Sequence, residues 1–400
     1  MSEEKLVPKL RFSGFDGEWN ETTLSDIATF SKGKGISKKD ISDDGIECVR
    51  YGELYTKYTE MIYNVDSKTN LDENELQLSE KYDILIPCSG ETAIDLATAS
   101  CIQKDQVAIG GDITIIKTNQ YAPFITYYLN QKKTEIAKYA QGVSIVHLYP
   151  KDFNVLNIKI PLIKEQKKIV HILEKISYKE QLLEKKLKSY QDFKKYLMQQ
   201  IFTQKLRFNF IDDWDVVKLE TLIEKGKAGG TPPSTNPDYY NGEIPFLSIK
   251  DMTEQGKYIV KTEKLITEEG LNNSSAWIIP KYSLLYSIYA SIGLVSINLT
   301  EVSTSQAIYG IILKEGVSLE YMYYYLTYFK KNIHRYVETG TQGNLNAKLL
   351  KSFEIALPSV DEQEMIVNIL SLVDKKIENM EKEVGKMNEF KKGLLQQMFI

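Results

Sequence analysis

Two polar runs stand at equivalent places in the two halves of this 400-residue sequence. The first run contains Gln141, Ser144, His147 and Lys151, and the second contains Gln342, Asn344, Asn346 and Lys348. Glutamine and asparagine amides can bind adenine through two hydrogen bonds, and lysine can reach guanine or a phosphate. Each run, taken as a whole, favours contact with DNA. A single histidine such as His147 more often has a structural role.

Lysines alternate with glycines in a second pair of segments. Lys32, Lys34 and Lys38 flank Gly33 and Gly35, and could bind phosphates through ammonium groups and exposed amides. The counterpart in the second half contains Lys227, followed by Thr231 and Ser234. A solvated loop explains each segment about equally well. Weaker loop candidates for DNA contact are Ser89, Glu91, Thr92, Lys250, Tyr289 and Ser291.

Motifs that would indicate catalysis are weak. Asn236-Pro237-Asp238-Tyr239 is similar to a motif of amino-methyltransferases, which also need a glycine-rich cofactor turn after an upstream strand. Residues 207–235 supply no such turn, and the sequence contains no G-x-x-x-x-G-K-[ST] phosphate loop. We therefore expect no catalytic site and no cofactor of its own in this chain.

Composition narrows the class of protein further. The formal charge of 50 − 54 = −4 argues against a protein that is basic over its whole surface. Three cysteines without C-x-x-C spacing suggest a reducing compartment, and three dispersed histidines make a metal site unexpected. The amino terminus lacks a signal-peptide pattern, and the most apolar stretch, residues 278–299, suits strands better than a membrane span. We expect a cytoplasmic protein that does not contact membranes.

The chain is a tandem repeat. Residues 158–203 align with residues 355–400 without a gap when the sequence is shifted by 197 positions. Identical residues include Pro161, Glu165 and Gln166, which match Pro358, Glu362 and Gln363. Each half is therefore predicted to be a variable body of about 160 residues followed by a well-matched tail of about 40 residues.

Both tails carry apolar residues in alternating steps of four and three, the spacing of a coiled-coil helix. The predicted seam residues are Ile169, Leu173, Ile176, Leu183, Leu187, Leu197, Ile366, Leu370, Val373, Ile377, Met380, Val384 and Leu394. Pro161 and Pro358 precede the tails, where a helix start tolerates proline.

Each seam also holds a lysine, Lys194 or Lys391. Such a lysine could fix the register of a helix pair, or its ammonium could reach solvent at a widening end. Residues 164–205 carry 11 Lys and 5 acidic residues (+6), and residues 361–400 carry 6 Lys and 8 acidic residues (−2). These charges predict that the two helices pair with each other, antiparallel because a body separates them.

The bodies mix short β-like runs, such as residues 82–86 and 282–286, with helix-like segments at 124–139 and 319–336. We predict an α+β fold with two pseudo-repeated domains joined by two long helices that pair as an antiparallel coiled coil. The predicted domains are residues 1–160 and 206–357, and the predicted helices lie within residues 161–205 and 358–400.

These features resemble the specificity subunits of type I restriction-modification systems. The similar segments are residues 11–19, residues 229–234, residues 236–252 and the tail patterns that begin at Pro161 and Pro358. The resemblance covers nearly the whole chain and is weaker at residues 36–120, as expected of a variable recognition domain.

The resemblance implies that the bodies are target recognition domains, each of which reads one half of a bipartite site in double-stranded DNA. The paired helices would set the spacing and dock two methyltransferase subunits, which methylate adenine N6 with S-adenosylmethionine. Restriction and translocase subunits, which use ATP and Mg²⁺, would join through them. Partner subunits would then neutralise many phosphates, so we expect weak DNA binding by this chain alone.

Two other classes of function compete with this hypothesis. A self-contained DNA methyltransferase or nuclease would bind its cofactor without a partner, and a coiled-coil scaffold would not bind duplex DNA. The Glu165-Gln166 and Glu362-Gln363 pairs either cap the helix starts or contact the methyltransferase.

Overall fold

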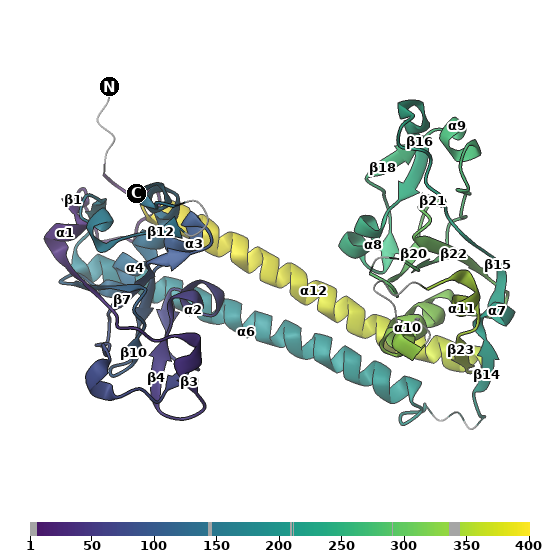
Figure 1. The fold of residues 1–400 in the computed structure, drawn as a ribbon, viewed down its shortest axis with the longest axis horizontal. Helices are drawn as coiled ribbons and strands as arrows, with labels where there is room; N and C mark the ends of the chain where they lie inside the picture. The colour runs from purple at the N-terminus through teal and green to yellow at the C-terminus, as the bar shows by residue number, and fades with distance from the viewer. Residues whose placement is uncertain (1–5, 143–145, 209, 211, 290, 336–344) are drawn as a thin grey trace. The chain divides into compact units, whose positions relative to one another are not determined.

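The chain divides into two compact units, each of which contains a part of both long helices. The computed structural model describes residues 6–142, 146–208, 210, 212–289, 291–335 and 345–400, without the side chains of residues 334 and 335. Unit 1 comprises residues 1–184 and 382–400, and unit 2 comprises residues 185–381. The long helices are α6 (Ile163–Phe202) and α12 (Val360–Met398), labelled in Figure 1.

The body of unit 1 is built on a five-stranded sheet whose central strands are apolar and buried. Its strand order is β2 (Ala28–Lys32), β11 (Ile113–Thr118), β7 (Ile84–Pro87), β9 (Ser100–Ile102), β5 (Met61–Ile62). A second sheet has the order β10 (Ala108–Ile109), β4 (Ile46–Val49), β6 (Lys68–Thr69), β3 (Ile41–Ser42). Two further pairs are β1 (Asn20–Thr23) with β13 (Asn157–Ile160), and β8 (Ser89–Gly90) with β12 (Val146–His147). Continuous apolar runs such as Ile84–Pro87 form strands here because both faces of the sheet are covered.

The body of unit 2 repeats this topology. Its five-stranded sheet has the order β15 (Ile223–Ala228), β22 (Ile308–Leu313), β19 (Leu284–Ser287), β20 (Val295–Asn298), β17 (Tyr258–Ile259). In both large sheets the edge strand, β5 or β17, pairs parallel with its neighbour, and the other pairings are antiparallel. The remaining strands are β14 (Asp215–Lys218) with β23 (Glu354–Leu357), and β18 (Lys264–Ile266), β16 (Tyr240–Leu247), β21 (Ser303–Thr304).

Short helices connect the strands of each body. In unit 1 they are α1 (Leu24–Ile27), α2 (Tyr51–Thr56), α3 (Ala93–Leu96), α4 (Ala122–Gln131) and α5 (Lys133–Ile136). In unit 2 they are α7 (Leu219–Leu222), α8 (Ile249–Gln255), α9 (Glu268–Asn272), α10 (Leu319–Phe329) and α11 (Ala347–Lys351). Helices α4 and α10, near the end of each body, bury most of their residues, because they are apolar on more than one face.

An aromatic cluster closes the core of each body with a residue from the end of a long helix. In unit 1, Phe399 follows α12 and packs on Phe124 at 5.3 Å and on Trp19 at 6.4 Å between ring centroids. In unit 2, Phe202 ends α6 and packs on Tyr325 at 5.3 Å, next to Tyr321 at 6.0 Å. Edge-to-face and offset contacts of this kind add to the stability gained by burying the rings.

Within each unit, α6 and α12 run antiparallel. In unit 1, Glu180 of α6 contacts Lys391 of α12, while Leu173 and Met398 belong to one buried cluster. In unit 2, Lys194 contacts Asp374, and the buried cluster there contains Ile201 and Ile366. All thirteen predicted seam residues are buried or half-buried, as a narrow apolar stripe between paired helices requires.

The α+β prediction, with two repeated bodies and two antiparallel long helices, is confirmed. The expected strands around residues 82–86 and 282–286 are β7 and β19, and the expected helical segments overlap α4 and α10. The apolar stretch at residues 278–299 forms β19 and β20. Among the described residues, no helix combines the length and the apolar character that a membrane span requires.

Candidate nucleic-acid interface

The start of each body is tied to the start of a long helix by a half-buried arginine that pairs with a buried glutamate. In unit 1, Arg11 donates from Nε and Nη2 to the two carboxylate oxygens of Glu165, both at 2.8 Å. In unit 2, Arg207 makes the same two contacts with Glu362, at 2.7 and 2.9 Å. Trp214 adds a third donor to Glu362 at 2.9 Å. Such two-point pairs fix orientation as well as position.

The glutamine that follows each of these glutamates is also used inside the protein. Gln166 donates to the carbonyl of Pro161 at 2.8 Å and accepts from the amide of Tyr121 at 3.1 Å. Gln363 donates to Pro358 at 3.0 Å and accepts from the amide of Ser318 at 2.9 Å. Both glutamate–glutamine pairs are buried and join the helix start to the body, which favours this structural role over contact with a methyltransferase.

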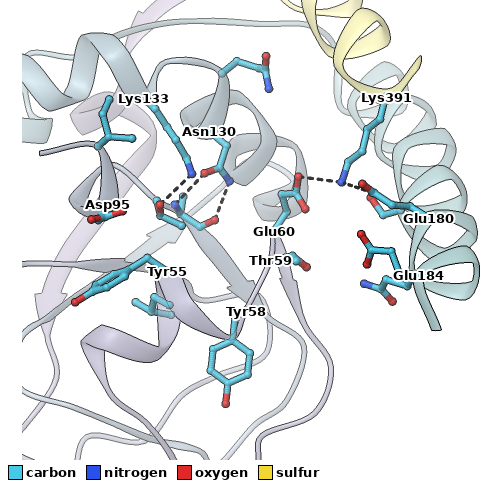
Figure 2. A pocket seen from close by; sticks show the side chains of 17 residues that line it. Tyr55, Tyr58, Thr59, Glu60, Asp95, Asn130, Lys133, Glu180, Glu184 and Lys391 are labelled. Atoms are coloured by element: carbon cyan, nitrogen blue, oxygen red, sulfur yellow. Dashed lines mark hydrogen bonds and ion pairs between the residues drawn. The ribbon is translucent and has the colours of Figure 1, made fainter. Parts of the chain in front are cut away.

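The seam lysine of α12 lies in a half-buried ion-pair network of unit 1. Lys391 contacts Glu180 at 3.1 Å and Glu60 at 3.4 Å, beside a cavity of about 520 Å³ (Figure 2). Burial would lower the pKa of Lys391, but the carboxylates of Glu60 and Glu180 raise it above its ordinary value. Lys391 therefore stays charged and links α6, α12 and the body, which supports the register role over the solvent-reaching one.

The seam lysine of α6 lies in a different network in unit 2. Lys194 pairs with Asp374, which also accepts a hydrogen bond from Tyr324 at 2.6 Å. Lys257 donates to the same tyrosine hydroxyl at 3.0 Å, and burial lowers the pKa of Lys257. The position in unit 1 that corresponds to Lys257 is Glu60. The equivalent lysines Lys194 and Lys391 therefore have different partners in the two units.

Four predicted DNA contacts of unit 1 gather around Tyr149, and we call these five residues the Tyr149 cluster. The ammonium groups of Lys32 and Lys151 lie 5.5 and 5.9 Å from the centre of the Tyr149 ring. His147 stacks on this ring at 6.0 Å and contacts the hydroxyl of Ser89 at 3.2 Å. Tyr149 is itself exposed, so the cluster presents two lysines and an aromatic face on one surface. Sequence reasoning missed Tyr149, although it stands between His147 and Lys151.

Gly33, next to Lys32, is required by packing, whereas a Cβ at Gly35 would lie in open space. A Cβ at Gly33 would lie 2.1 Å from the carbonyl oxygen of Gly110, so no larger residue fits there. The amides of Gly33 and Lys34 donate to the carbonyls of Ile113 and Ile109 at 3.0 and 2.9 Å. The predicted use of exposed amides is therefore wrong for these two residues, whereas the side chains of Lys32 and Lys34 are exposed.

The other predicted contacts of unit 1 are not members of the Tyr149 cluster, although some of them lie next to it. Lys38 and Glu91 line a concavity of about 1090 Å³. Thr92 caps α3 by accepting from the amide of Asp95, and Ser89 lies on strand β8 instead of the predicted loop. Gln141 forms an isolated β-bridge with His147 and keeps its side chain exposed, and Ser144 lies outside the described residues.

The lysine–glycine segment of unit 2 borders Trp277. The ammonium group of Lys225 lies 4.9 Å from the centre of this ring, and the indole nitrogen donates to the carbonyl of Lys227 at 3.3 Å. The Lys227 side chain is exposed, and Thr231 donates to the side chain of Gln306 nearby. This surface pairs lysines with an aromatic ring, as the Tyr149 cluster does in unit 1.

The remaining candidates of unit 2 are scattered. Lys250 is exposed but pairs with Glu263 at 2.9 Å. Ser234, Tyr289, Ser291 and Lys348 are exposed. The side chain of Asn346 caps α11 by accepting from the amide of Leu349, so its oxygen is already used. Gln342 and Asn344 lie outside the described residues.

Features associated with catalysis or metal binding have structural explanations. Asn236 caps a short turn, Pro237–Tyr239, by accepting from the amide of Asp238. The cysteines are buried, and burial raises the pKa of Cys48 to about 11 and that of Cys101 to about 12, which disfavours a reactive thiolate. Among the described residues, no group of three or more His, Cys, Asp or Glu could hold a metal ion.

A body that occurs twice and is tied both times to a long helix through the same arginine–glutamate pair defines a protein of two duplicated domains. The family described as "Type I restriction modification DNA specificity domain" matches residues 16–189 and 211–386. The two matched ranges cover most of both halves, so the chain belongs to this family and carries two copies of its domain.

Relatives within the family match in part or over nearly the whole length. The type I restriction enzyme MjaIX specificity subunit of Methanocaldococcus jannaschii is 35% identical over 194 residues, 47% of this chain and 44% of that subunit. The EcoR124I/EcoR124II specificity subunit of Escherichia coli is 32% identical over 171 residues, 40% of this chain and 41% of that subunit. The chain thus spans less than half the length of these two relatives. The MjaVIII specificity subunit of M. jannaschii is 23% identical over 400 residues, 94% of this chain and 91% of that subunit.

Solved structures share the fold. The S subunit of a type I restriction-modification system from M. genitalium has a TM-score of 0.63 at 16% identity and covers 98% of this chain and 99% of that one. A chain from a structural study of type I restriction-modification complex assembly has a TM-score of 0.60 at 15% identity, and the match covers 95% of this chain and 97% of that one.

Proposed function

We propose that this chain is the DNA-recognition component of a type I restriction-modification complex, and that each unit contacts one half of a bipartite site in double-stranded DNA. The observation that carries this proposal is the duplication of one body in a family of DNA specificity domains. Each body carries its own lysine–aromatic surface, around Tyr149 in unit 1 and Trp277 in unit 2. Lysines beside aromatic rings suit contact with phosphates and bases.

The long helices are suited to a spacer. A helix of 40 residues, such as α6, extends about 60 Å, and adjacent half-sites in duplex DNA lie one turn of about 34 Å apart or a multiple of it. The ion pairs of Lys391 and Lys194 hold the helix register in each unit. A constant register would keep the distance between two half-sites constant.

The long helices also carry matched exposed phenylalanines. Phe193 and Phe390 occupy the same repeat position, and 48% and 55% of their surfaces are exposed. Two equivalent apolar positions support the docking of two copies of one partner, the methyltransferase subunit. S-adenosylmethionine for adenine N6 methylation, and ATP with Mg²⁺ for restriction, would then be bound by partner subunits, and this chain would be non-catalytic and act in the cytoplasm.

A body exchange tests the proposal. Residues 1–160 are replaced by the corresponding body of another specificity subunit, and the chimaera is expressed with its methyltransferase subunits. Methylation-sensitive long-read sequencing of the host genome then reports the methylated motif. We expect one half-site to change while the other half-site and the spacer stay as in the parent.

The matched control exchanges residues 206–357 and is expected to change only the other half-site. A chimaera that alters both half-sites at once would contradict a model with two independent readers. Methylation of DNA by this chain alone, without a methyltransferase subunit, would instead support a self-contained methyltransferase.

A further inference from the structure

Arginine is rare in this chain, and its four positions divide by role. Arg11 and Arg207 are used in the twin pairs with Glu165 and Glu362, and the side chain of Arg335 lies outside the described part of the chain. Arg50 lines the concavity of about 1090 Å³ in unit 1. We propose that Arg50 reads a guanine in the half-site contacted by unit 1, a role that rests on the proposed function and adds a residue and a base to it.

The concavity adjoins the Tyr149 cluster. Gly35, three residues after Lys32, and Glu91, two residues after Ser89, both line it. Gly110 forms part of the wall, and a Cβ there would lie 3.4 Å from the Cα of Arg50. A surface that contacts the backbone of DNA through the Tyr149 cluster would therefore bring base edges toward Arg50.

A buried carboxylate holds Arg50 in place. Glu53 accepts from the Arg50 amide at 3.0 Å and from its Nη2 at 3.4 Å. Lys57 and Ser67 donate to the same carboxylate, and only 3% of Glu53 is exposed. Glu53 is therefore a positioning residue, which reduces the rotamer freedom that Arg50 would lose on binding.

The guanidinium keeps hydrogen-bonding capacity for a ligand. Its hydrogen bond to Glu53 is made through Nη2, and no hydrogen bond from Nη1 to another described residue is found. The Nε of Arg50 is buried and also has no partner among the described residues, so the donors that can face a ligand are those of Nη1 and Nη2. About a quarter of the side chain is exposed, so the fork lies at the boundary between the protein and the concavity. A planar fork with free donors matches two acceptors that lie side by side, such as guanine O6 and N7.

The charges of the concavity favour a base edge over a phosphate. Its basic residues are balanced by an equal number of acidic ones; the eight are Lys38, Lys39, Arg50, Lys57, Asp40, Glu53, Glu91 and Asp112. A phosphate would need a net positive lining, whereas a guanine edge is neutral and is recognised by hydrogen bonds. Arg50 is thus assigned to sequence readout and not to general DNA affinity.

The test is a selection from a randomised duplex library by the full chain assembled with its methyltransferase subunits. Arg50→Ala is expected to lower the preference for guanine at one position of one half-site by about 5- to 150-fold, the range of one good two-point base contact. Preferences at the other half-site are expected to stay unchanged. Lys39→Ala, an exposed cation on the same concavity, is the matched control and should leave every base preference unaltered.

Thermal melting of each variant separates readout from folding. Arg50→Ala leaves Glu53 with Lys57 and Ser67, and Arg50→Gln keeps an amide that can still donate to Glu53; both should lose the guanine preference. Uniformly weaker binding with a smaller salt dependence would make Arg50 a phosphate contact and overturn the proposal, as would unchanged preferences. Failure of the wild-type assembly to select any sequence would instead refute the proposed function.

Discussion

Removal of Arg11 should destabilise unit 1 more than removal of Arg207 destabilises unit 2. Arg11 and Arg207 make the same two-point contact with a buried glutamate. Glu362 also accepts from the indole of Trp214, whereas the Trp19 indole nitrogen is buried without a partner among the described residues. Arg11→Ala therefore removes the arginine that pairs with Glu165. In the Arg207→Ala variant, Glu362 keeps the hydrogen bond from Trp214.

The magnitude follows from the burial of the carboxylates. The Glu165 side chain is 1% exposed, and loss of the partner of a buried ion costs about 3–5 kcal/mol. In a unit of about 200 residues this corresponds to a fall in Tm of about 6–20 °C. The retained hydrogen bond from Trp214 to Glu362 is worth about 1.5–3 kcal/mol, so Arg207→Ala should cost correspondingly less.

Scanning calorimetry of the full chain measures both losses, and native-state hydrogen exchange shows whether α4 or α10 opens. The double variant Arg11→Leu/Glu165→Leu should recover most of the stability, because a buried apolar pair carries no unpaired charge. Equal losses for Arg11→Ala and Arg207→Ala, or a Tm unchanged by Arg11→Ala, would refute the reasoning.

Two further predictions concern unit 1. Phe399→Ala should lower the free energy of unfolding by about 3–5 kcal/mol and speed hydrogen exchange in α4, because Phe399 packs on Phe124 and Trp19. A loss below about 1 kcal/mol, measured by urea unfolding, would contradict the role of Phe399 in completing the core. Burial would raise the pKa of Glu53, but hydrogen bonds from Ser67, Lys57 and Arg50 lower it below its ordinary value. The contribution of the Glu53 carboxylate to folding stability should therefore be complete above about pH 5 and be lost as the pH falls through the lowered pKa. The midpoint of urea unfolding should depend less on pH in this range in the Glu53→Gln variant than in the wild type.

Much of the architecture could be predicted because its signals are local or repeated. The alternating four-and-three spacing reports a helix face directly, so the seam around Ile169 and Ile366 identified α6 and α12. A shift of 197 residues revealed the duplication, and opposite net charges indicated that the helices pair. The lysine–glycine segment of unit 1 pointed to the surface that holds the Tyr149 cluster, although Gly33 in it is required by packing.

The candidate site was predicted only in part, because its members come from distant segments. Lys32, Ser89 and His147 stood out by residue type, but only folding brings them to Tyr149. Arg50 carries no motif at all, and the role proposed for it depends on Glu53 and on the glycines that line the concavity.

By itself, the sequence determined the repeat, the helical seams and the family, since periodicity and residue identity are properties of the chain alone. Tertiary structure decided which acids neutralise Lys391 and Lys194 and which aromatic ring closes each core. Phe399 completes the core that begins with Trp19, and Phe202 completes the core that contains Trp214. Such contacts depend on which charges are buried and on how the surfaces of remote segments fit together. No spacing of residues along the chain indicates them.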